Sequence, residues 1–542
     1  MAVFGCDIGN GFAYVSVPGR VAKSSPESAF PPEIRAEGMP TDAYIEPDGT
    51  VVVEEKTISE ESYANRGRIV HVIKRHLDEP SIVLAPAKGL QHSSLGIEPR
   101  RVYAAIAQRA LDEAFKCMMD ETGDAIHDVV LTYPAILLRT PQLIDMLSDV
   151  VGELTAPDGE PYKVIGRVPE PAAVALDFLA FMRHEVEEAQ RIDRRDVTVV
   201  VYDLGHGTFD TALVTARAVE DGEEKPWEVH DYGGSPKVGG ADFDRRIEEL
   251  LEEAADEVEP GKREENLTKN SIQAFAVKCK HDLTKETSAS VAFSNDDRVS
   301  VERTISREEF EEMTSDLVDE TVDEVSHMFD TARDLKLGVT HLVLSGGASR
   351  MPMVRAALEE LVRKRCCGQV SIMLHRPSQA VSFGATRYGM QLERSLAGTE
   401  CGDVPASTLG VRRVTGLVQL VARDTGIVVP DKNGARLLVL VKQGTSLPAT
   451  SERVPVDIEG AETRVIVGCA REHRDAESVG TALSAGKFRE MGRLWPAVPL
   501  RVGSCELELA LGEDGSVSCF LYSKNGKVVR MGWEYLGADS KV

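Results

Sequence analysis

The sequence predicts an α/β domain that contains an internal duplication, followed by a smaller all-β module. Two segments, one around Asp7 and one around Asp203, share the same plan of an apolar strand, an aspartate and a glycine turn. Near residue 395 helical periodicity stops, and short alternating strands separated by turn residues follow. The duplication and the change of periodicity together define the two parts of the chain.

The segment around Asp203 has the features of a phosphate-binding turn. Residues 198–202 are uncharged and mostly β-branched, so they predict a buried strand that ends at Asp203. Gly205 and Gly207 let backbone N–H groups converge on an anion, because no Cβ blocks the approach. Asp203 and Asp210 flank the turn, and carboxylate oxygens suit a hydrated Mg²⁺ ion. Taken alone, the segment fits a β-hairpin with two solvated aspartates equally well.

The segment around Asp7 makes the phosphate-binding interpretation more specific. Residues 3–6 predict an apolar strand that ends in Asp7, and Gly9 and Gly11 turn the chain back into residues 12–17. Two such hairpins that face each other across a cleft can hold a phosphate chain from both sides. The repeat therefore favours a nucleotide site between two similar halves.

Composition narrows the function classes. The chain has 542 residues, 42% hydrophobic and 28% charged, with a net charge of −26. This acidic balance argues against a nucleic-acid-binding surface and against an anionic membrane surface. Nine cysteines without a C-x-x-C pair indicate a reducing compartment. Because we find neither a signal-peptide pattern nor an apolar run of membrane-spanning length, we expect a cytoplasmic protein that binds neither nucleic acid nor membrane.

Periodicity places the remaining elements of the α/β part. Strands are expected at 128–134, at 164–165, around 288–304 and at 340–345. Helices are expected at 99–122, 140–151, 171–190, 241–257, 269–284, 306–335, 353–366 and 378–392. Glu170 lies at a strand-to-helix junction, and the Gly346-Gly347 turn precedes another helix. Lys74 is either a cation near a helix end or a lysine pointed into the cleft.

After a linker at 396–408, the pattern predicts an antiparallel β module, which we expect to be a sandwich. Its strands are expected at 414–421, 437–441, 453–458, 463–469, 505–511 and 517–523. No long helix is expected after the last strand.

Six motifs in order resemble those of the heat-shock protein 70 family, the DnaK-type chaperones, over nearly the whole chain. The segment Asp203-Leu-Gly-His-Gly-Thr-Phe-Asp210 is similar to the family's DLGGGTFD, and Cys6-Asp-Ile-Gly9 to its first phosphate loop. The segments at 238–244, 343–352, 170–175 and 73–77 resemble LGGEDFD, LVGGSTRIP, EPTAAA and AKRLIG. The resemblance implies an actin-like (ribonuclease H-like, duplicated) ATPase domain at 1–395, the linker at 396–408, and a β-sandwich peptide-binding domain at 409–542.

The resemblance also implies site residues and cofactors, namely ATP or ADP with Mg²⁺. Asp7, Asp203 and Asp210 are expected to organise Mg²⁺ through its waters. Lys74, Glu170, Asp203 and Thr208 are expected to take part in hydrolysis, with Lys74 at the γ-phosphate and Glu170 acting through the Mg²⁺ water shell. The residues expected to contact the nucleotide are Asp7, Gly9, Asn10, Gly11, Gly205, His206, Gly207, Thr208, Gly239, Gly240, Lys280, His281, Thr284, Gly346, Gly347, Ala348 and Arg350.

Several positions depart from the family pattern. Asn10 replaces a threonine, and His206 replaces a glycine whose backbone approaches phosphate, so we expect either slower hydrolysis or an added cationic contact. Val277 and His281 stand where the family has Glu and Arg, which is expected to weaken nucleotide affinity. The hydrophobic interdomain linker is not recognisable near 395–408, and the helical lid of the family is expected to be missing.

Three functions are compatible with these features. The first is an ATP-dependent chaperone that binds unfolded or extended peptides, as a monomer, with J-domain co-chaperones and nucleotide-exchange factors as partners. The second is a nucleotide-binding regulatory or interaction protein with little hydrolysis, an alternative supported by Asn10 and His206. The third, a filament-forming actin-like protein or a sugar kinase, is disfavoured by the β module.

Overall fold

A computed structural model gives the structure of the α/β part and of most strands of the β module. It describes residues 2–19, 26–53, 68–84, 95–184, 196–218, 227–258, 269–294, 300–366, 370–397, 417–419, 425–431, 434–442, 445, 449–458, 465–470, 479, 482–483, 488–496, 503–511, 517–523 and 528–535. The predicted linker at 396–408 falls almost entirely outside these ranges.

The first lobe is built on a sheet with the strand order β11-β10-β1-β2-β3. Strands β1 (Phe4–Ile8) and β2 (Phe12–Pro18) form the expected hairpin around Asp7. Strands β10 (Asp128–Tyr133) and β11 (Lys163–Pro169) run parallel to β1, while β3 (Pro26–Ser28) and the short β4 (Met39–Pro40) are antiparallel to β2. The carboxyl ends of β1, β10 and β11 therefore lie at the same edge of the sheet.

The second lobe repeats this arrangement with the order β18-β17-β12-β13-β14. Strands β12 (Val197–Leu204) and β13 (Phe209–Ala216) form the hairpin around Asp203, and β17 (Val339–Ser345) and β18 (Ser371–Leu374) continue the sheet in parallel. Strand β14 (Trp227–Ser235) takes the place that β3 has in the first lobe. The shared strand order and direction confirm the predicted duplication.

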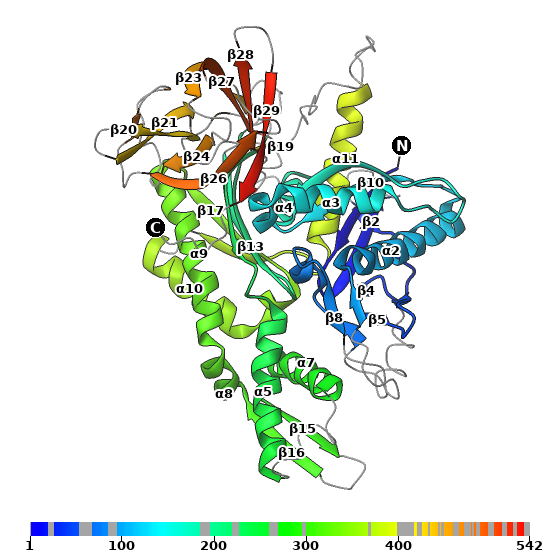
Figure 1. Cartoon of the computed structure of the whole chain (residues 1–542). Helices are drawn as coiled ribbons and strands as arrows, with labels where there is room; N and C mark the ends of the chain where they lie inside the picture. Colours follow the sequence, from blue (N-terminus) through cyan, green and yellow to red (C-terminus); the bar gives the residue numbers. More distant parts are fainter. Residues whose placement is uncertain are drawn as a thin grey trace.

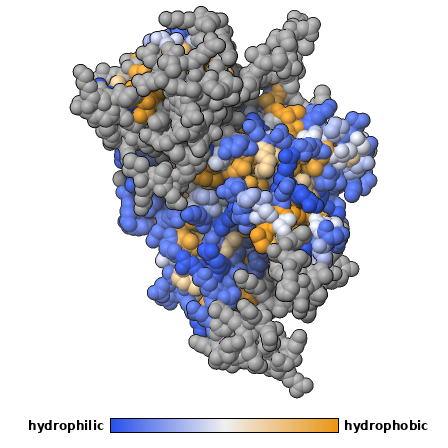
Figure 2. Space-filling model, viewed as in Figure 1, coloured by the Kyte–Doolittle hydropathy of each residue, from blue (hydrophilic) through white to orange (hydrophobic). Residues whose placement is uncertain are grey.

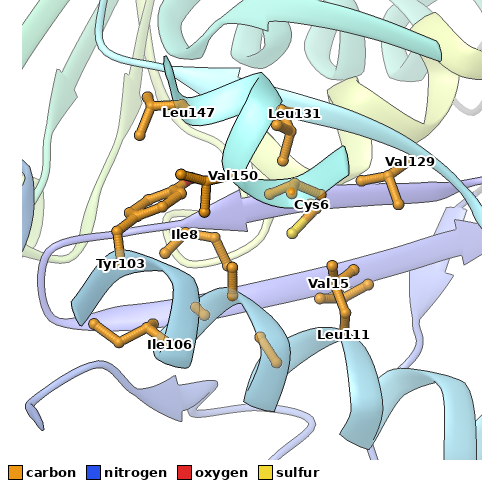
Figure 3. Close-up of a cluster of buried hydrophobic side chains, with 14 of the residues drawn as sticks. Cys6, Ile8, Val15, Tyr103, Ile106, Leu111, Val129, Leu131, Leu147 and Val150 are labelled. Atoms are coloured by element: carbon orange, nitrogen blue, oxygen red, sulfur yellow. The ribbon is translucent and has the colours of Figure 1, made fainter. Parts of the chain in front are cut away.

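The core beneath the first hairpin holds the Asp7 turn in place. Figure 3 shows Cys6 and Ile8 of β1 and Val15 of β2 facing Tyr103 and other apolar side chains of helix α2 (Pro99–Thr122). Helix α3 (Pro141–Gly152) closes the other side of this core. Burying an aliphatic or aromatic side chain fully contributes about 1.5–3 kcal/mol, so this core fixes the strand end that carries Asp7.

Two helices pass between the lobes and pack on each other. Helix α4 (Glu170–His184) lies on β12 and β13 of the second lobe, and helix α11 (Ala380–Ala397) lies on β1, β2 and β10 of the first. They touch at Gly384, where an added Cβ would overlap the backbone of Ala173. The expected helix over 171–190 is described only to His184, since residues 185–195 lie outside the described ranges.

A buried ion cluster lies beside this crossing. The Asp177 carboxylate of α4 is fully buried, and it accepts hydrogen bonds from His375 Nε2 at 2.8 Å, Arg376 Nη1 at 2.9 Å and Arg387 Nε at 2.8 Å. Burial alone would raise the pKa of Asp177, but the hydrogen bond from His375 and the charges of Arg387 and Arg376 hold it below its usual value. The cluster joins α4, α11 and the end of β18 by ionic contacts.

The second lobe carries an extension of helices and one hairpin (Figure 1). Its elements are α5 (Gly240–Val258), α7 (Lys269–Lys285), β15 (Ser288–Ser294), β16 (Ser300–Ser306) and α8 (Arg307–Met313). Helices α9 (Ser315–Asp334) and α10 (Pro352–Cys366) pack against the sheet of the second lobe. The single helix expected at 306–335 is wrong, because it breaks at Thr314 into α8 and α9. Thr314 leaves helical geometry (φ −119°, ψ 7°), and its hydroxyl donates to the carbonyl of Phe310.

The β module forms one hydrogen-bonded sheet with the order β22-β27-β28-β29-β26-β24-β20-β21-β25, and β23 also pairs with β27. Its strands are β20 (Thr425–Asp431), β21 (Gly434–Val441), β22 (Ala449–Thr450), β23 (Val454–Ile458), β24 (Val465–Ala470), β25 (Ala482–Leu483), β26 (Phe488–Pro496), β27 (Gly503–Leu511), β28 (Val517–Ser523) and β29 (Val528–Tyr535). The all-β prediction is confirmed for this module. Five of the six expected strands are present, but β20, β22, β25, β26 and β29 were not predicted.

The sixth expected strand belongs elsewhere. Strand β19 (Leu417–Gln419) pairs in parallel with β14, so it extends the sheet of the second lobe rather than that of the β module. Its register places Leu417 opposite Trp227 and Gln419 opposite Val229. The prediction of a module strand at 414–421 is therefore wrong. The three residues instead lengthen the α/β sheet immediately before the β module begins.

The visible surface of the described residues is predominantly hydrophilic, with apolar residues in small separate groups (Figure 2). None of the helices in the described ranges combines the length and apolar composition that a bilayer crossing requires.

Candidate functional site

Four carboxylates gather where the two hairpins face each other. Asp7 lies in β1, Asp203 in β12, Asp210 in β13, and Glu170 is the first residue of α4. Asp203 and Asp210 are opposite each other in the β12–β13 ladder. Asp210 Oδ1 accepts a hydrogen bond of 2.7 Å from the backbone N–H of Ala135, which belongs to the first lobe. The structure thus brings the acidic residues of both lobes into one site.

Lys74 lies among these carboxylates. It belongs to the short 3₁₀ helix η2 (Ile73–His76), and its Nζ is 2.6 Å from Glu170 Oε1 and 3.9 Å from Asp7 Oδ1. Its side chain is only 2% exposed. Lys74 therefore points toward the acidic residues between the two lobes, in agreement with the second of its two sequence interpretations.

The site carries more buried negative than positive charge. Burial raises the pKa of Asp203 far above its usual value, and the nearby charges of Glu170, Asp210 and Asp7 raise it further. Burial also raises the pKa values of Asp7 and Asp210, against the opposing effect of Lys74. Burial alone would lower the pKa of Lys74, but Glu170 and Asp7 raise it overall. A cluster of buried carboxylates with one lysine fits a hydrated Mg²⁺ ion, which prefers oxygen ligands and retains several waters.

The second glycine turn is fastened to the start of α5. Gly240 N–H donates to the carbonyl of Gly205 at 2.8 Å, and Ala241 N–H donates to that of His206 at 2.8 Å. A Cβ on Gly239 would lie 2.5 Å from the carbonyl carbon of Gly207, so only glycine fits there. Two glycine-rich segments of the second lobe are thereby stacked. Backbone N–H groups of such turns can bind a phosphate group, because glycine has no Cβ to block the approach.

The Gly346-Gly347 turn follows β17 next to Asp203. Gly346 has φ +78°, and a Cβ there would overlap the carbonyl of Leu204 and lie 2.8 Å from Asp203 Oδ1. Gly347 begins the 3₁₀ helix η6 (Gly347–Arg350), and Gly347 and Arg350 are exposed. The structure therefore places this turn beside the acidic cluster, with an exposed arginine one turn further along.

Of the three expected residues of α7, Lys280 and Thr284 are hydrogen-bonded within their own lobe. Lys280 Nζ donates to Asp244 Oδ2 at 2.6 Å and to the carbonyl of Gly240 at 2.8 Å. Thr284 Oγ1 donates to the backbone carbonyl of Lys280, and His281 is exposed. Lys280 is thus held beside the second glycine turn by contacts within its own lobe.

Several contacts across the site were not predicted. Arg75 Nη2 lies 2.5 Å from Asp242 Oδ2, and Arg75 Nε donates to the carbonyl of Gly207 at 2.7 Å, so one side chain of the first lobe binds two segments of the second. Thr132 Oγ1 donates to Asp7 Oδ1 at 3.2 Å. The basic pair Lys74-Arg75 in the sequence could have indicated the contacts of Arg75, whereas no sequence pattern around Thr132 indicates its hydrogen bond to Asp7.

The fold and the site define a duplicated, two-lobed α/β protein in which two strand–aspartate–glycine turns face each other. Comparison with known proteins agrees with this class. The model of the family described as "Hsp70 protein" matches residues 163–446, just over half of the 542 residues. The chain belongs to the Hsp70 family.

Similar relatives carry the name chaperone protein DnaK. That of Deinococcus deserti is 27% identical over 431 residues, which cover 78% of this chain and 59% of the relative. Those of Halobacterium salinarum and Mycoplasmoides gallisepticum are 26% identical over 481 residues and 27% over 365, covering 87% and 66% of this chain. The chain spans 66% and 56% of the length of these two relatives.

Proposed function

We propose that this protein is an ATP-dependent chaperone of the DnaK type, which hydrolyses ATP between its two lobes and binds extended peptides through its β module. The observation that carries the proposal is the convergence of Asp7, Lys74, Glu170, Asp203 and Asp210 between two glycine turns. Phosphoryl transfer depends chiefly on positioning and charge neutralisation, which such a constellation supplies.

The surroundings of each site residue suggest a separate role for it in hydrolysis. Asp7, Asp203 and Asp210 would hold Mg²⁺ through its waters. When bound, Mg²⁺–ATP supplies the transferable phosphoryl group and the charge that binds the carboxylates. Lys74, oriented by Glu170, would hold the terminal phosphate and position the attacking water, because its buried ammonium has a fixed direction.

A proton acceptor is also available. Burial and neighbouring carboxylates raise the pKa of Asp203, so its carboxylate is a stronger base than an exposed aspartate. We assign to Asp203 the uptake of the proton released by the attacking water. Thr208, buried in the second turn and hydrogen-bonded to Asp210, would contribute its backbone to phosphate binding.

Strand β19 supports coupling between the two parts of the chain. Its three residues pair with β14 of the second lobe, a few residues before β20 opens the β module. A movement of the second lobe would therefore be transmitted through hydrogen-bonded backbone. The β module would hold an extended peptide by backbone pairing and an apolar pocket. J-domain co-chaperones and nucleotide-exchange factors are proposed as partners by family membership.

ATP turnover measured with and without an unfolded peptide tests the proposal. We expect Mg²⁺-dependent hydrolysis that the peptide accelerates and that Lys74→Ala abolishes. Nucleotide binding without turnover would contradict it and favour the nucleotide-binding interaction protein. ATP turnover that does not change when peptide is added would contradict coupling between the nucleotide site and the β module.

A further inference from the structure

The glycine turns at residues 9–11 and 205–207, called here the first and the second phosphate loop, contact each other through two side chains and two glycines. Asn10 of the first loop packs against Gly207 of the second, where an added Cβ would overlap the Asn10 amide. His206 of the second loop packs against Gly11 of the first, where a Cβ would lie 3.0 Å from His206 Cγ and 3.1 Å from its Cβ. We call this reciprocal contact of Asn10, Gly11, His206 and Gly207 the loop interlock.

The Asn10 side chain and the His206 backbone are each hydrogen-bonded within their own lobe. Asn10 is 6% exposed, and its Oδ1 accepts a hydrogen bond of 2.9 Å from the backbone N–H of Lys74. The carbonyl of His206 accepts from Ala241 N–H, which anchors the histidine on the start of α5. Arg75 supports the same contact, since it binds the Gly207 carbonyl from the first lobe and Asp242 of the second. The contact is thus made by groups that are already fixed on their own lobes.

His206 is uncharged in this contact at neutral pH. Burial lowers its pKa to about 4, and the cation of Lys280 on α7 contributes to the lowering. Asp244 of α5 and Asp42 of the first lobe act in the opposite direction, while His71 of the first lobe adds a smaller lowering effect. A neutral imidazole packs against the Gly11 backbone without the desolvation cost of an imidazolium.

We propose that the loop interlock is a latch that holds the cleft closed and competes with the nucleotide for the gap between the phosphate loops. The proposal rests on the proposed function, because it takes the phosphate chain to lie between these turns. A phosphate group that contacts both loops has to replace the Asn10 amide and the His206 ring. The apparent affinity for nucleotide is therefore the intrinsic affinity multiplied by the fraction of molecules in which the latch is open.

The latch makes a prediction that needs no nucleotide. Hydrogen–deuterium exchange of the full chain, measured without added nucleotide, reports the protection of residues 9–12 on the first loop. In His206→Ala we expect these amides to exchange about tenfold faster, because the ring that packs against Gly11 from the opposite lobe is removed. The matched control is His76→Ala, a half-exposed histidine on η2 that pairs with Glu79, and it should leave their exchange unchanged.

Calorimetric titration with Mg²⁺–ADP gives the second readout. We expect His206→Ala to bind about tenfold more tightly than the wild type, the increase that follows if the latch is closed in about nine molecules of ten. Unchanged exchange of residues 9–12 overturns the latch. Faster exchange with weaker ADP binding also overturns it, because His206 is then a phosphate ligand rather than a competitor. Faster exchange in a chain that binds no nucleotide supports the closed contact of the loop interlock and refutes the proposed function, together with the competition that rests on it.

Protonation provides a further check on the latch. Its opening exposes His206, whose pKa then returns toward about 6.5. Protonation of His206 therefore favours the open form, so the closed form of the latch is stable above about pH 6.5 and loses stability as the pH falls below that value. The protection of residues 9–12, corrected for intrinsic exchange, should therefore decrease between pH 7 and pH 5 in the wild type and stay constant in His206→Ala. Equal pH dependence in both would contradict the role of the ring.

Discussion

Replacing Lys74 with methionine removes the cation that lies among the buried carboxylates of the site. Lys74 Nζ is 2.6 Å from Glu170 Oε1 and 3.9 Å from Asp7 Oδ1, and its side chain is 2% exposed. Methionine retains much of the apolar stem, so the loss is mainly electrostatic. Removing one partner of a buried ion pair costs about 3–5 kcal/mol, because the remaining charge stays desolvated. We expect the unfolding free energy of the α/β part to fall by about 3 kcal/mol at pH 8.

The loss should be smaller in acid. Burial raises the pKa of Asp7, and Lys74 opposes that effect, so the variant should have a still higher pKa at Asp7. A carboxyl whose folded pKa is raised takes up a proton in the folded state before the unfolded chain does. The stability lost above the folded pKa is therefore recovered as pH falls toward the unfolded value of about 4. The difference between wild type and variant should decrease between pH 8 and pH 5.5.

Urea unfolding followed by circular dichroism at the two pH values measures this difference for Lys74→Met. Lys278→Met is the matched control, because Lys278 pairs with Asp282 at 2.5 Å but its side chain is 70% exposed. An exposed pair of this kind should give no measurable change. An equal loss for Lys74→Met at both pH values, or no loss at pH 8, would refute the electrostatic reasoning.

Three further predictions concern the glycine turn, the acidic cluster and β19. In thermal unfolding, Gly346→Ala should lower the unfolding free energy by about 1–3 kcal/mol, because Gly346 has φ +78° and no room for a Cβ. The control Gly347→Ala should be neutral, because nothing lies within 4 Å of the added Cβ. Burial raises the pKa values of Asp203 and Asp210, so the folded state binds protons more tightly than the unfolded chain. The melting temperature of the wild type should therefore rise as the pH falls from 8 to 6, and a steady decrease in melting temperature would contradict this expectation. Val418→Pro removes a backbone donor from β19, so it should abolish the stimulation of ATP turnover by peptide and leave basal turnover unchanged. Undiminished stimulation would contradict this expectation.

The parts of the fold that the sequence predicts are those governed by local patterns. Strand β12, which carries Asp203, is buried along its whole length, as the uncharged composition of residues 198–202 indicates. The glycines at 207 and 239 stand out in the sequence, and the structure requires Gly239 because a Cβ there would lie 2.5 Å from the carbonyl carbon of Gly207. The repeat of strand, aspartate and glycine was enough to predict the duplication, since each copy carries the same local signal.

What the sequence does not reveal depends on segments that are distant in the chain. Asp177 meets His375 and Arg387 about two hundred residues later, and neither neighbourhood contains a pattern that pairs them. Strand β19 is only three residues long, and its partner is chosen by the position of the β14 edge rather than by its own periodicity. The contact of Arg75 with Asp242 likewise joins residues of different lobes that lie 167 positions apart in the chain. Long-range approach, rather than local propensity, decides these features.

Peptide affinity in the presence of ATP and of ADP tests the central claim most directly, because it requires both the nucleotide site and its coupling to the β module. A fluorescently labelled extended peptide, titrated with the full chain and Mg²⁺, gives the dissociation constant in each state. We predict a different affinity in ATP and ADP, and loss of that difference in Val418→Pro. Equal affinity in both nucleotides for the wild type would contradict an ATP-driven chaperone.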